Sequence, residues 1–245
     1  MANLSVSSVT VRFSGNVAVN DVDLTAESGH ITGLIGPNGA GKTTLFNVIT
    51  GLLQPTAGRV TLDGRDITKL TPYKRARRGL ARTFQRLELF SMLTARENIR
   101  VAADIHKGWA RTTKSPDRVA DEILERVGLT EVADVRVDSL PTGQGRLVEL
   151  GRALATNPRV LLLDEPAAGQ DDAETDRFAE LLREFAADGM GVLLVEHDVS
   201  LVMDVCETIH VLDFGEIIAV GPPEEIRVND AVLAAYLGAP VEPTA

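Results

Sequence analysis

The sequence predicts an α/β fold with a mostly parallel sheet, an antiparallel β layer beside it and an inserted helical subdomain. Short apolar runs, each followed by glycine or polar residues, alternate with helix-like segments: "HITGLIG", "RVLLLDE" and "MGVLLVEH". Such runs are typical of parallel strands buried on both faces. The alternating stretches "LSVSSVTVRF" and "GRVTLDG" favour the antiparallel layer. From Glu97 to Arg136 the pattern is helical, with no convincing strand, and this stretch predicts the subdomain.

The elements before the helical stretch follow from their residue types. The β-branched residues of 4–13 predict a strand, and the apolar run at 30–36 predicts a buried strand that ends in glycine. Residues 42–53 predict a helix, which the glycine and proline around its end should stop. A short alternating strand is expected at 58–64.

The strand pattern returns after the helical stretch. Residues 159–165 and 190–197 predict buried strands, and between them "DRFAELLREF" places its large apolar residues on one helix face. Residues 208–221 predict a hairpin that turns at the Phe-Gly pair, and 224–238 predict short helices. This order of elements completes the predicted α/β core.

Composition limits the classes of function. The 245 residues suffice for a sizeable core, and no apolar run approaches the ~18–20 residues that span a bilayer. The first residues lack the basic and apolar regions of a signal peptide, and the single cysteine, Cys206, excludes an internal disulfide, so we expect a cytoplasmic protein. The net charge of −10 disfavours nucleic acid as a partner.

One segment is basic in this acidic chain. "YKRARRGLARTFQR" is either the solvated face of a helix or a surface for an acidic partner or lipid headgroups. Its cationic residues are Lys74, Arg75, Arg77, Arg78, Arg82 and Arg86.

"GPNGAGKT" fills every fixed position of the phosphate-loop pattern, between a predicted strand and a predicted helix. Its glycines let the backbone amides approach phosphate, and the helix N-terminus adds positive partial charge. Lys42 should reach the β- and γ-phosphates of ATP, and the Thr43 hydroxyl should bind Mg²⁺. The predicted core is therefore that of a phosphate-loop NTPase. The expected nucleotide contacts are Gly36, Pro37, Asn38, Gly39, Ala40, Gly41, Lys42, Thr43 and Thr44.

Two adjacent carboxylates, Asp164 and Glu165, end the apolar strand "VLLLDE". Successive strand residues point in opposite directions, so the two groups need not share a role. Asp164 suits Mg²⁺, directly or through water. Glu165 can lie near the γ-phosphate and polarise an attacking water, a role whose loss costs ~10²–10⁴ in rate.

A second glycine-containing loop, "LPTGQ", precedes another predicted helix. A helix that begins near Gly143 offers free amides and a dipole end to an anion. Either one monomer encloses ATP with both loops, or this loop closes over ATP held by another copy. In the second arrangement two ATPs lie at a two-fold interface.

These motifs together resemble the ATP-binding subunit of an ABC transporter, over nearly the whole chain. "LPTGQ" resembles the family signature LSGGQ, which implies nucleotide contacts by Leu140, Thr142, Gly143 and Gln144. The resemblance further implies metal binding by the glutamine-loop residue, a D-loop contact, a γ-phosphate donor and an aromatic that stacks on adenine. The corresponding residues are Gln85, Asp171, His197 and Phe13.

Two positions depart from that family pattern. Pro141 replaces the signature serine, so neither a hydroxyl nor an N–H is present there, and Gln170 replaces the usual D-loop leucine. Neither change touches Glu165, so an active ATPase is still expected, with Glu165, His197 and Lys42 as its catalytic residues.

The branch resembled is the larger ATPase of importers for branched-chain and other hydrophobic amino acids. It implies membrane permease subunits as partners, a second copy or sister ATPase, and, indirectly, an extracytoplasmic solute-binding protein. The chain is expected to be cytoplasmic, peripheral on the inner face of the membrane. Residues 1–245 would form one ABC ATPase domain, with a catalytic core of 1–85 and 157–245 and a helical subdomain of 86–156.

Other functions stay open at this point. The cargo could be urea, a short amide or another small solute, and a lipid exporter has a similar ATPase. ABC-type ATPases that act on DNA or ribosomes usually have a long coiled-coil insert or two cassettes, which this chain lacks. An assembly ATPase and a non-hydrolysing nucleotide-binding module are the remaining alternatives, and Glu165 and His197 argue against the latter.

Overall fold

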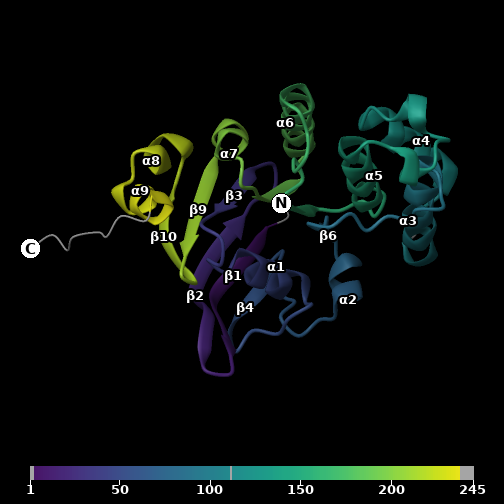
Figure 1. Ribbon diagram of the computed structural model, residues 1–245. Helices are drawn as coiled ribbons and strands as arrows, with labels where there is room; N and C mark the ends of the chain where they lie inside the picture. The colour runs from purple at the N-terminus through teal and green to yellow at the C-terminus, as the bar shows by residue number, and fades with distance from the viewer. Residues whose placement is uncertain (1–2, 111, 238–245) are drawn as a thin grey trace, which may run out of the picture.

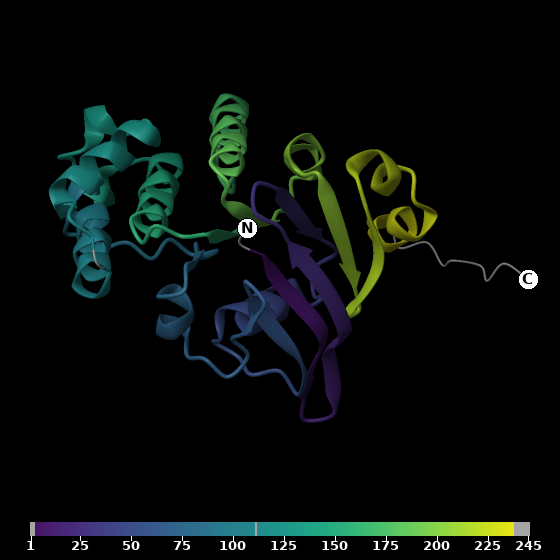
Figure 2. The ribbon, with the colours of Figure 1, turned by 180° about the vertical axis from the view of Figure 1, so that it is seen from behind.

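The computed structural model describes residues 3–110 and 112–237, and contains two sheets (Figures 1 and 2). The larger sheet has six strands in the order β10-β9-β3-β8-β7-β6. These strands are β3 Ile31–Ile35, β6 Leu80–Arg82, β7 Val160–Asp164, β8 Gly191–Val195, β9 Thr208–Asp213 and β10 Glu216–Gly221. The smaller sheet has the order β2-β1-β4-β5. Its strands are β1 Leu4–Phe13, β2 Asn16–Ala26, β4 Ala57–Leu62 and β5 Arg65–Asp66.

The six-stranded sheet is parallel except for its edge strand β10. Every residue of β3, β7 and β8 is buried, as the continuous apolar runs predicted. Because parallel strands end at the same edge, the loops after β3, β6, β7 and β8 lie close together. This edge holds most of the candidate site.

The antiparallel layer is also confirmed, but its strand β2 was not predicted as an element. β1 pairs with β2 through several register shifts, and Ser8 and Asp21 have left-handed φ values of 48° and 50°. These bulges interrupt the alternation of apolar and polar residues, which is the sequence signal of a strand.

Nine helices lie within the described residues. Their bounds are α1 Lys42–Thr50, α2 Pro72–Ala76, α3 Ala95–Trp109, α4 Pro116–Arg126, α5 Thr142–Leu154, α6 Asp172–Ala187, α7 Val199–Val205, α8 Pro223–Arg227 and α9 Asp230–Leu237. Helices α3, α4 and α5 pack together at one end of the molecule, and α8 and α9 lie at the other end (Figure 1). No helix in the described part of the chain is long and apolar enough to cross a bilayer.

Helix boundaries differ from the prediction in three places. The helix expected at 42–53 ends at Thr50, because Gly51 adopts a left-handed cap with φ 82°. Helix α6 is longer than "DRFAELLREF", since Asp171 and Glu174 form a capping box before it. The final stretch forms α8 and α9, and Gly238 lies outside the described residues.

Two apolar clusters stabilise the fold on the two faces of the large sheet. One contains α1, the inner face of the small sheet and side chains such as Leu34, Leu162 and Leu193. The other joins the opposite sheet face, including Leu161 and Leu163, to α6, α7 and the α3–α5 group. Helix α1 is therefore buried between the two sheets, with its N-terminus at the site.

Candidate functional site

The phosphate loop connects β3 to α1. Gly36 has a φ of 152°, and a Cβ there would lie 1.9 Å from the carbonyl oxygen of Leu212, so only glycine fits. Gly41, with φ 111°, is the residue before α1, and no side chain caps that helix. The first turn of α1 also contains no acidic residue, so its free amides suit an anion.

Lys42 is folded back onto its own loop. Its Nζ donates hydrogen bonds to the carbonyl oxygens of Gly36 at 2.6 Å and Pro37 at 3.0 Å. Burial lowers the pKa of the Lys42 ammonium, and the charges of Glu165 and Asp164 oppose that shift. The lysine therefore lies between the loop and the acid pair, next to an exposed Thr43.

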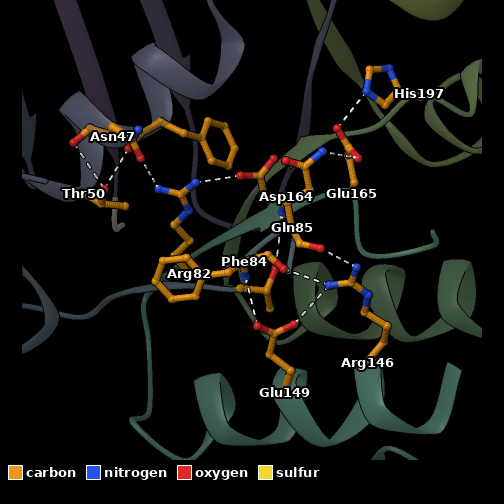
Figure 3. Close-up of polar contacts among 12 residues, drawn as sticks. Asn47, Thr50, Arg82, Phe84, Gln85, Arg146, Glu149, Asp164, Glu165 and His197 are labelled. Atoms are coloured by element: carbon orange, nitrogen blue, oxygen red, sulfur yellow. Dashed lines mark hydrogen bonds and ion pairs between the residues drawn. The ribbon is translucent and has the colours of Figure 1, made fainter. Parts of the chain in front are cut away.

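Asp164 is buried at the end of β7 and forms an ion pair with Arg82, with 2.6 Å between Oδ2 and Nη2. Arg82 ends the neighbouring strand β6, and its Nη1 donates to Asn47 Oδ1 of α1 at 2.7 Å. Figure 3 shows this connection from α1 to the acid pair. No motif in the sequence indicates this ion pair, although both residues end adjacent parallel strands.

Glu165 brings two other predicted site residues together. It follows β7 in a left-handed conformation, with φ 50°, and its N–H donates to the Val195 carbonyl at 2.8 Å. Its Oε2 accepts a hydrogen bond from Gln85 Nε2 at 2.9 Å, and its Oε1 lies 2.7 Å from His197 Nε2 (Figure 3). A glutamate, a glutamine and a histidine from three different loops thus form one cluster.

A buried carboxylate, Glu196, holds the backbone around this cluster. Its Oε1 accepts the Ala167 N–H at 2.7 Å, and its Oε2 accepts the His197 N–H at 3.0 Å. Burial raises the pKa of Glu196. Glu196 was not among the predicted site residues, although it stands directly before the predicted histidine.

The second loop leads into α5, which begins at Thr142 after Pro141. Gly143 is buried, and a Cβ there would lie 2.9 Å from both carboxylate oxygens of Glu174. Glu174 itself accepts the Asp171 N–H at 3.1 Å. The second loop and the segment with Asp171 are therefore neighbours within one subunit.

Several predicted residues are not joined to the phosphate loop. Within the described residues, no hydrogen bond or ion pair connects Asp171 or the second loop to residues 36–44. The second-loop residues concerned are Leu140, Thr142, Gly143 and Gln144. Phe13 ends β1 with 48% of its side chain exposed, free to meet a planar ligand.

Helix α5 also grips the loop that carries Gln85. Arg146 donates to the carbonyl oxygens of Phe84 at 2.8 Å and Gln85 at 2.5 Å, and Glu149 accepts the Phe84 N–H at 3.1 Å (Figure 3). The two side chains approach each other to 3.4 Å and are nearly buried. Burial raises the pKa of Glu149, which Arg146 opposes. Neither Arg146 nor Glu149 belongs to a motif that was recognised in the sequence.

The C-terminal helix α9 reaches the same region. Burial raises the pKa of Tyr236, and a hydrogen bond with the backbone of Gly36 opposes that shift. A residue far along the chain thus lies near the first glycine of the phosphate loop. No pattern in the sequence indicated this proximity.

The oxygen atoms of the predicted metal ligands fit a site for magnesium bound together with a nucleotide. Among the described residues, no group of three or more His, Cys, Asp or Glu side chains could hold a metal by itself. Mg²⁺ at nucleotide sites takes few protein ligands and completes its shell with phosphate and water. The Thr43 hydroxyl, the Gln85 amide and Asp164 are the hard oxygen donors around the phosphate loop, and the Arg82 ion pair uses only Oδ2 of Asp164.

Comparison with known families gives two matches. The model described as "ABC transporter" matches residues 19–168, and the model described as "Branched-chain amino acid ATP-binding cassette transporter" matches residues 216–242. The first includes the phosphate loop, the second loop and the acid pair. The second includes Tyr236 of α9, which lies near Gly36.

Curated relatives match the chain almost end to end. The high-affinity branched-chain amino acid transport ATP-binding protein BraF of Pseudomonas aeruginosa is 43% identical, over 96% of this chain and 97% of the relative. The corresponding LivG protein of Salmonella typhimurium is 41% identical over the same shares. The lipopolysaccharide export system ATP-binding protein LptB of Haemophilus influenzae is 37% identical, over 97% and 98%.

Solved structures agree with the fold. An ATP-binding cassette of an ABC transporter superposes with a TM-score of 0.87 at 31% identity, covering 96% of this chain and 99% of that one. A cassette in its ADP conformation gives 0.86 at 30% identity, covering 97% and 99%. A dimeric cassette bound to ADP and Pi gives 0.81 at 27% identity, covering 90% and 98%.

Proposed function

The chain belongs to the ABC transporter family of ATP-binding cassettes, and from this premise we propose that it powers the import of branched-chain or other hydrophobic amino acids. The cluster of Gln85, Glu165 and His197 beside the phosphate loop is the observation that carries the ATPase function. The two curated relatives named for branched-chain amino acid transport, and the family model over residues 216–242, support the cargo.

ATP binding begins with an exchange of partners at Lys42. Its Nζ leaves the carbonyl oxygens of Gly36 and Pro37 and turns to the β- and γ-phosphates, which offer a stronger, charge-assisted contact. The amides of residues 38–44 surround the phosphates at the N-terminus of α1. Phe13 stacks on the adenine from the end of β1.

Thr43, Gln85 and Asp164 would hold Mg²⁺, which would neutralise charge that develops on the phosphate oxygens. The 2.6 Å ion pair with Arg82 holds the Asp164 carboxylate in place. The contact from Arg82 to Asn47 links that ion pair to α1.

Glu165 polarises the attacking water, and Gln85 and His197 hold its carboxylate from both sides. Its left-handed backbone is a strained conformation for a non-glycine residue, and such strain is concentrated at functional sites. His197 then donates to the γ-phosphate. Positioning and electrostatic stabilisation supply most of the acceleration in phosphoryl transfer.

The second loop acts on ATP held by a second copy or by a sister ATPase. Leu140, Thr142, Gly143 and Gln144 carry the free amides of α5 to the partner's γ-phosphate, and Asp171 lies beside them in the interface. The dimeric cassette bound to ADP and Pi supports this arrangement. Pro141 removes one amide donor from the loop, and the helix N-terminus supplies the others.

Membrane permease subunits dock in a groove beside the Gln85 loop. A cavity of about 370 Å³ there is lined by α2, the loop after β6 and α5. Leu52, Tyr73 and Phe84 expose 56%, 56% and 40% of their side chains along it. The groove is lined by residues of the catalytic core, 1–85 and 157–245, and by residues of the helical subdomain, 86–156. A permease that binds there would contact both parts. The chain then works at the cytoplasmic face of the membrane, with a solute-binding protein on the other side.

Lipid export is the second candidate, because LptB of Haemophilus influenzae is 37% identical over nearly the whole chain. The amino-acid relatives have higher identity, and the C-terminal family model matches as well. The ATPase chemistry is the same for both functions. Which cargo is transported therefore depends on the permease that binds in the groove.

Purification of the tagged chain from native membranes, followed by identification of co-purifying proteins, tests this proposal. We expect two multi-span permeases, a sister ATPase and an associated solute-binding protein, and uptake of labelled leucine when the complex is placed in liposomes. Partners that extract lipopolysaccharide instead would transfer the assignment to lipid export. Recovery of the chain alone, or with ribosomes or DNA-repair proteins, would contradict a transport role, and the ATPase rate of a Lys42→Ala variant checks the nucleotide site independently.

A further inference from the structure

The basic segment at 74–86 divides into residues with a partner in the fold and residues without one. Arg75 is buried, and its guanidinium donates to backbone carbonyls at the end of α1 and before α2. The acceptors are Val48 at 2.6 Å, Ile49 at 2.6 Å, Thr68 at 2.6 Å and Leu70 at 3.0 Å. Arg82 is paired with Asp164. Neither arginine is therefore available at the surface.

Arg77 and Arg78 instead open onto a cavity of about 470 Å³, separate from the nucleotide site. Arg65 of β5 and Arg159 before β7 line the same cavity, and the rings of His106 and Trp109 from α3 form one wall. Four arginines from three distant parts of the sequence thus converge on one space. Asp63 is the single acidic residue that lines it.

In the part of the chain that the structure describes, only one of the four guanidinium groups is paired with a carboxylate. Arg159 lies 2.6 Å from Asp63, and its stem packs where a Cβ on Gly79 would be. Within the described residues, no carboxylate forms an ion pair with Arg65, Arg77 or Arg78. Arg77 lies over the Trp109 ring at 5.9 Å. Burial lowers the pKa of His106, so this ring is neutral near pH 7 and adds no charge.

This concentration of positive charge is unusual in a chain whose formal net charge is −10. Like charges around one cavity repel each other, and an anion between them removes that repulsion. Guanidinium groups present a planar fork that matches phosphate with two parallel hydrogen bonds. The neutral aromatic wall suits the less polar part of a bound molecule.

We propose that the cavity formed by Arg65, Arg77, Arg78, Arg159, His106 and Trp109 binds a phosphate-bearing ligand. The phosphate lies among the arginine side chains, and Arg159 is held in place for it by Asp63 and Gly79. The phosphate belongs either to a free compound or to the headgroup of an anionic lipid. The site is independent of the transport function proposed above.

Trp109 lines the cavity and is the only tryptophan in the chain, so its fluorescence reports binding at this site. Its fluorescence is followed while inorganic pyrophosphate is added, and in a parallel series while phosphatidylglycerol vesicles are added. Potassium chloride of equal ionic strength and phosphatidylcholine vesicles are the controls. The pyrophosphate series is repeated with Lys42→Ala, where a persisting signal cannot arise from the phosphate loop.

The matched variants are the double substitutions Arg65→Ala/Arg78→Ala and Arg177→Ala/Arg183→Ala. Both remove two positive charges, and all four side chains are exposed, so thermal unfolding should stay close to that of the native chain. The first pair loses two charge-assisted contacts and should weaken binding by at least about tenfold. The second pair lies on α6 and should leave binding unchanged.

A saturable fluorescence change with pyrophosphate but not with vesicles would identify a free phosphate compound. A change with phosphatidylglycerol but not phosphatidylcholine would identify a lipid headgroup. Either result supports the site if the cavity variant loses it and the α6 variant retains it. The proposal is overturned if neither probe changes the fluorescence, if chloride gives the same change, or if both double variants respond alike.

Discussion

The guanidinium of Arg146 donates a hydrogen bond of 2.5 Å to the backbone carbonyl of Gln85, whose own side chain lies 2.9 Å from Glu165. Helix α5, which follows the second loop, therefore holds Gln85, and Gln85 in turn contacts Glu165, the proposed base. A movement of α5 would displace the Gln85 amide with it, because Glu149 grips the preceding N–H as well.

Arg146→Ala should slow ATP hydrolysis by about 10- to 100-fold, since a displacement of order 1 Å at a catalytic group has effects of that size. The KM for ATP should change little, because Arg146 lies away from the phosphate loop. Steady-state kinetics on the purified chain make the measurement, with Arg177→Ala as the control for loss of an exposed arginine. Unchanged kcat in Arg146→Ala would mean that Gln85 is positioned without α5. Glu149→Gln, which keeps an acceptor for the Phe84 N–H, should have a smaller effect.

Glu165→Gln should lower kcat by about 10²–10⁴ while ATP still binds, because the substitution removes the base and preserves the shape. ATP should then hold two copies together, and size-exclusion chromatography with and without ATP detects that dimer. Glu180→Gln, on the exposed face of α6, is the matched control. Normal turnover by the Glu165 variant would assign the base to another residue.

His210 should make the protein less stable in acid. Burial lowers its pKa from 6.5 to about 4, and its Nδ1 has no hydrogen-bond partner among the described residues. Between these values the unfolded chain binds a proton that the folded chain does not, so the free energy of unfolding falls as pH drops from 6.5 toward 4. The fall in pKa from 6.5 to about 4 corresponds to a loss of about 3–4 kcal/mol once the pH is below 4.

His210→Leu removes this titration. The free energy of unfolding of the native protein should therefore fall relative to that of the variant as the pH drops from 6.5 toward 4. Urea unfolding at several pH values gives the comparison, with His30→Leu at an exposed position as the control. Parallel pH profiles for the native chain and His210→Leu would show that the buried ring does not titrate in this range.

Gly36→Ala should prevent the phosphate loop from forming, because its Cβ would overlap the Leu212 carbonyl oxygen. We expect loss of ATP binding together with a lower unfolding temperature. Gly64 also has a positive φ, of 71°, but open space around its Cβ, so Gly64→Ala should cost only about 1–2 kcal/mol. Equal unfolding temperatures for the two variants would be evidence against the crowding at Gly36.

The parts of the fold that were predicted from sequence are those with a local signal. The buried strands β3, β7 and β8 are continuous apolar runs, and the phosphate loop is a contiguous motif. Strand β2 was missed because bulges break its alternation, and α2 and α7 are too short for a helical period to register.

The parts of the site that were missed depend on residues distant in sequence. Arg82 and Asp164 are 82 positions apart, and Arg146 and Gln85 are 61 apart. Each pair meets because two parallel strands end at one edge or because α5 packs beside the loop after β6. No periodic pattern in the sequence indicates a contact between residues so far apart, so these contacts are visible only in the folded chain.

Arg75 gives helix α1 a second role. The guanidinium fastens the last carbonyls of α1 to α2, and α2 forms one side of the groove that contains Tyr73. The nine residues of α1 span about 13 Å, from the phosphate loop at one end to this fastening at the other. Helix α1 thus connects the groove to the phosphate loop, in addition to the connection from α5 through Gln85. A displacement of α2 would therefore move the phosphate loop through α1, in addition to any movement of Glu165 through the Gln85 side chain. Loss of either connection alone would weaken the coupling between the groove and the nucleotide site without abolishing it.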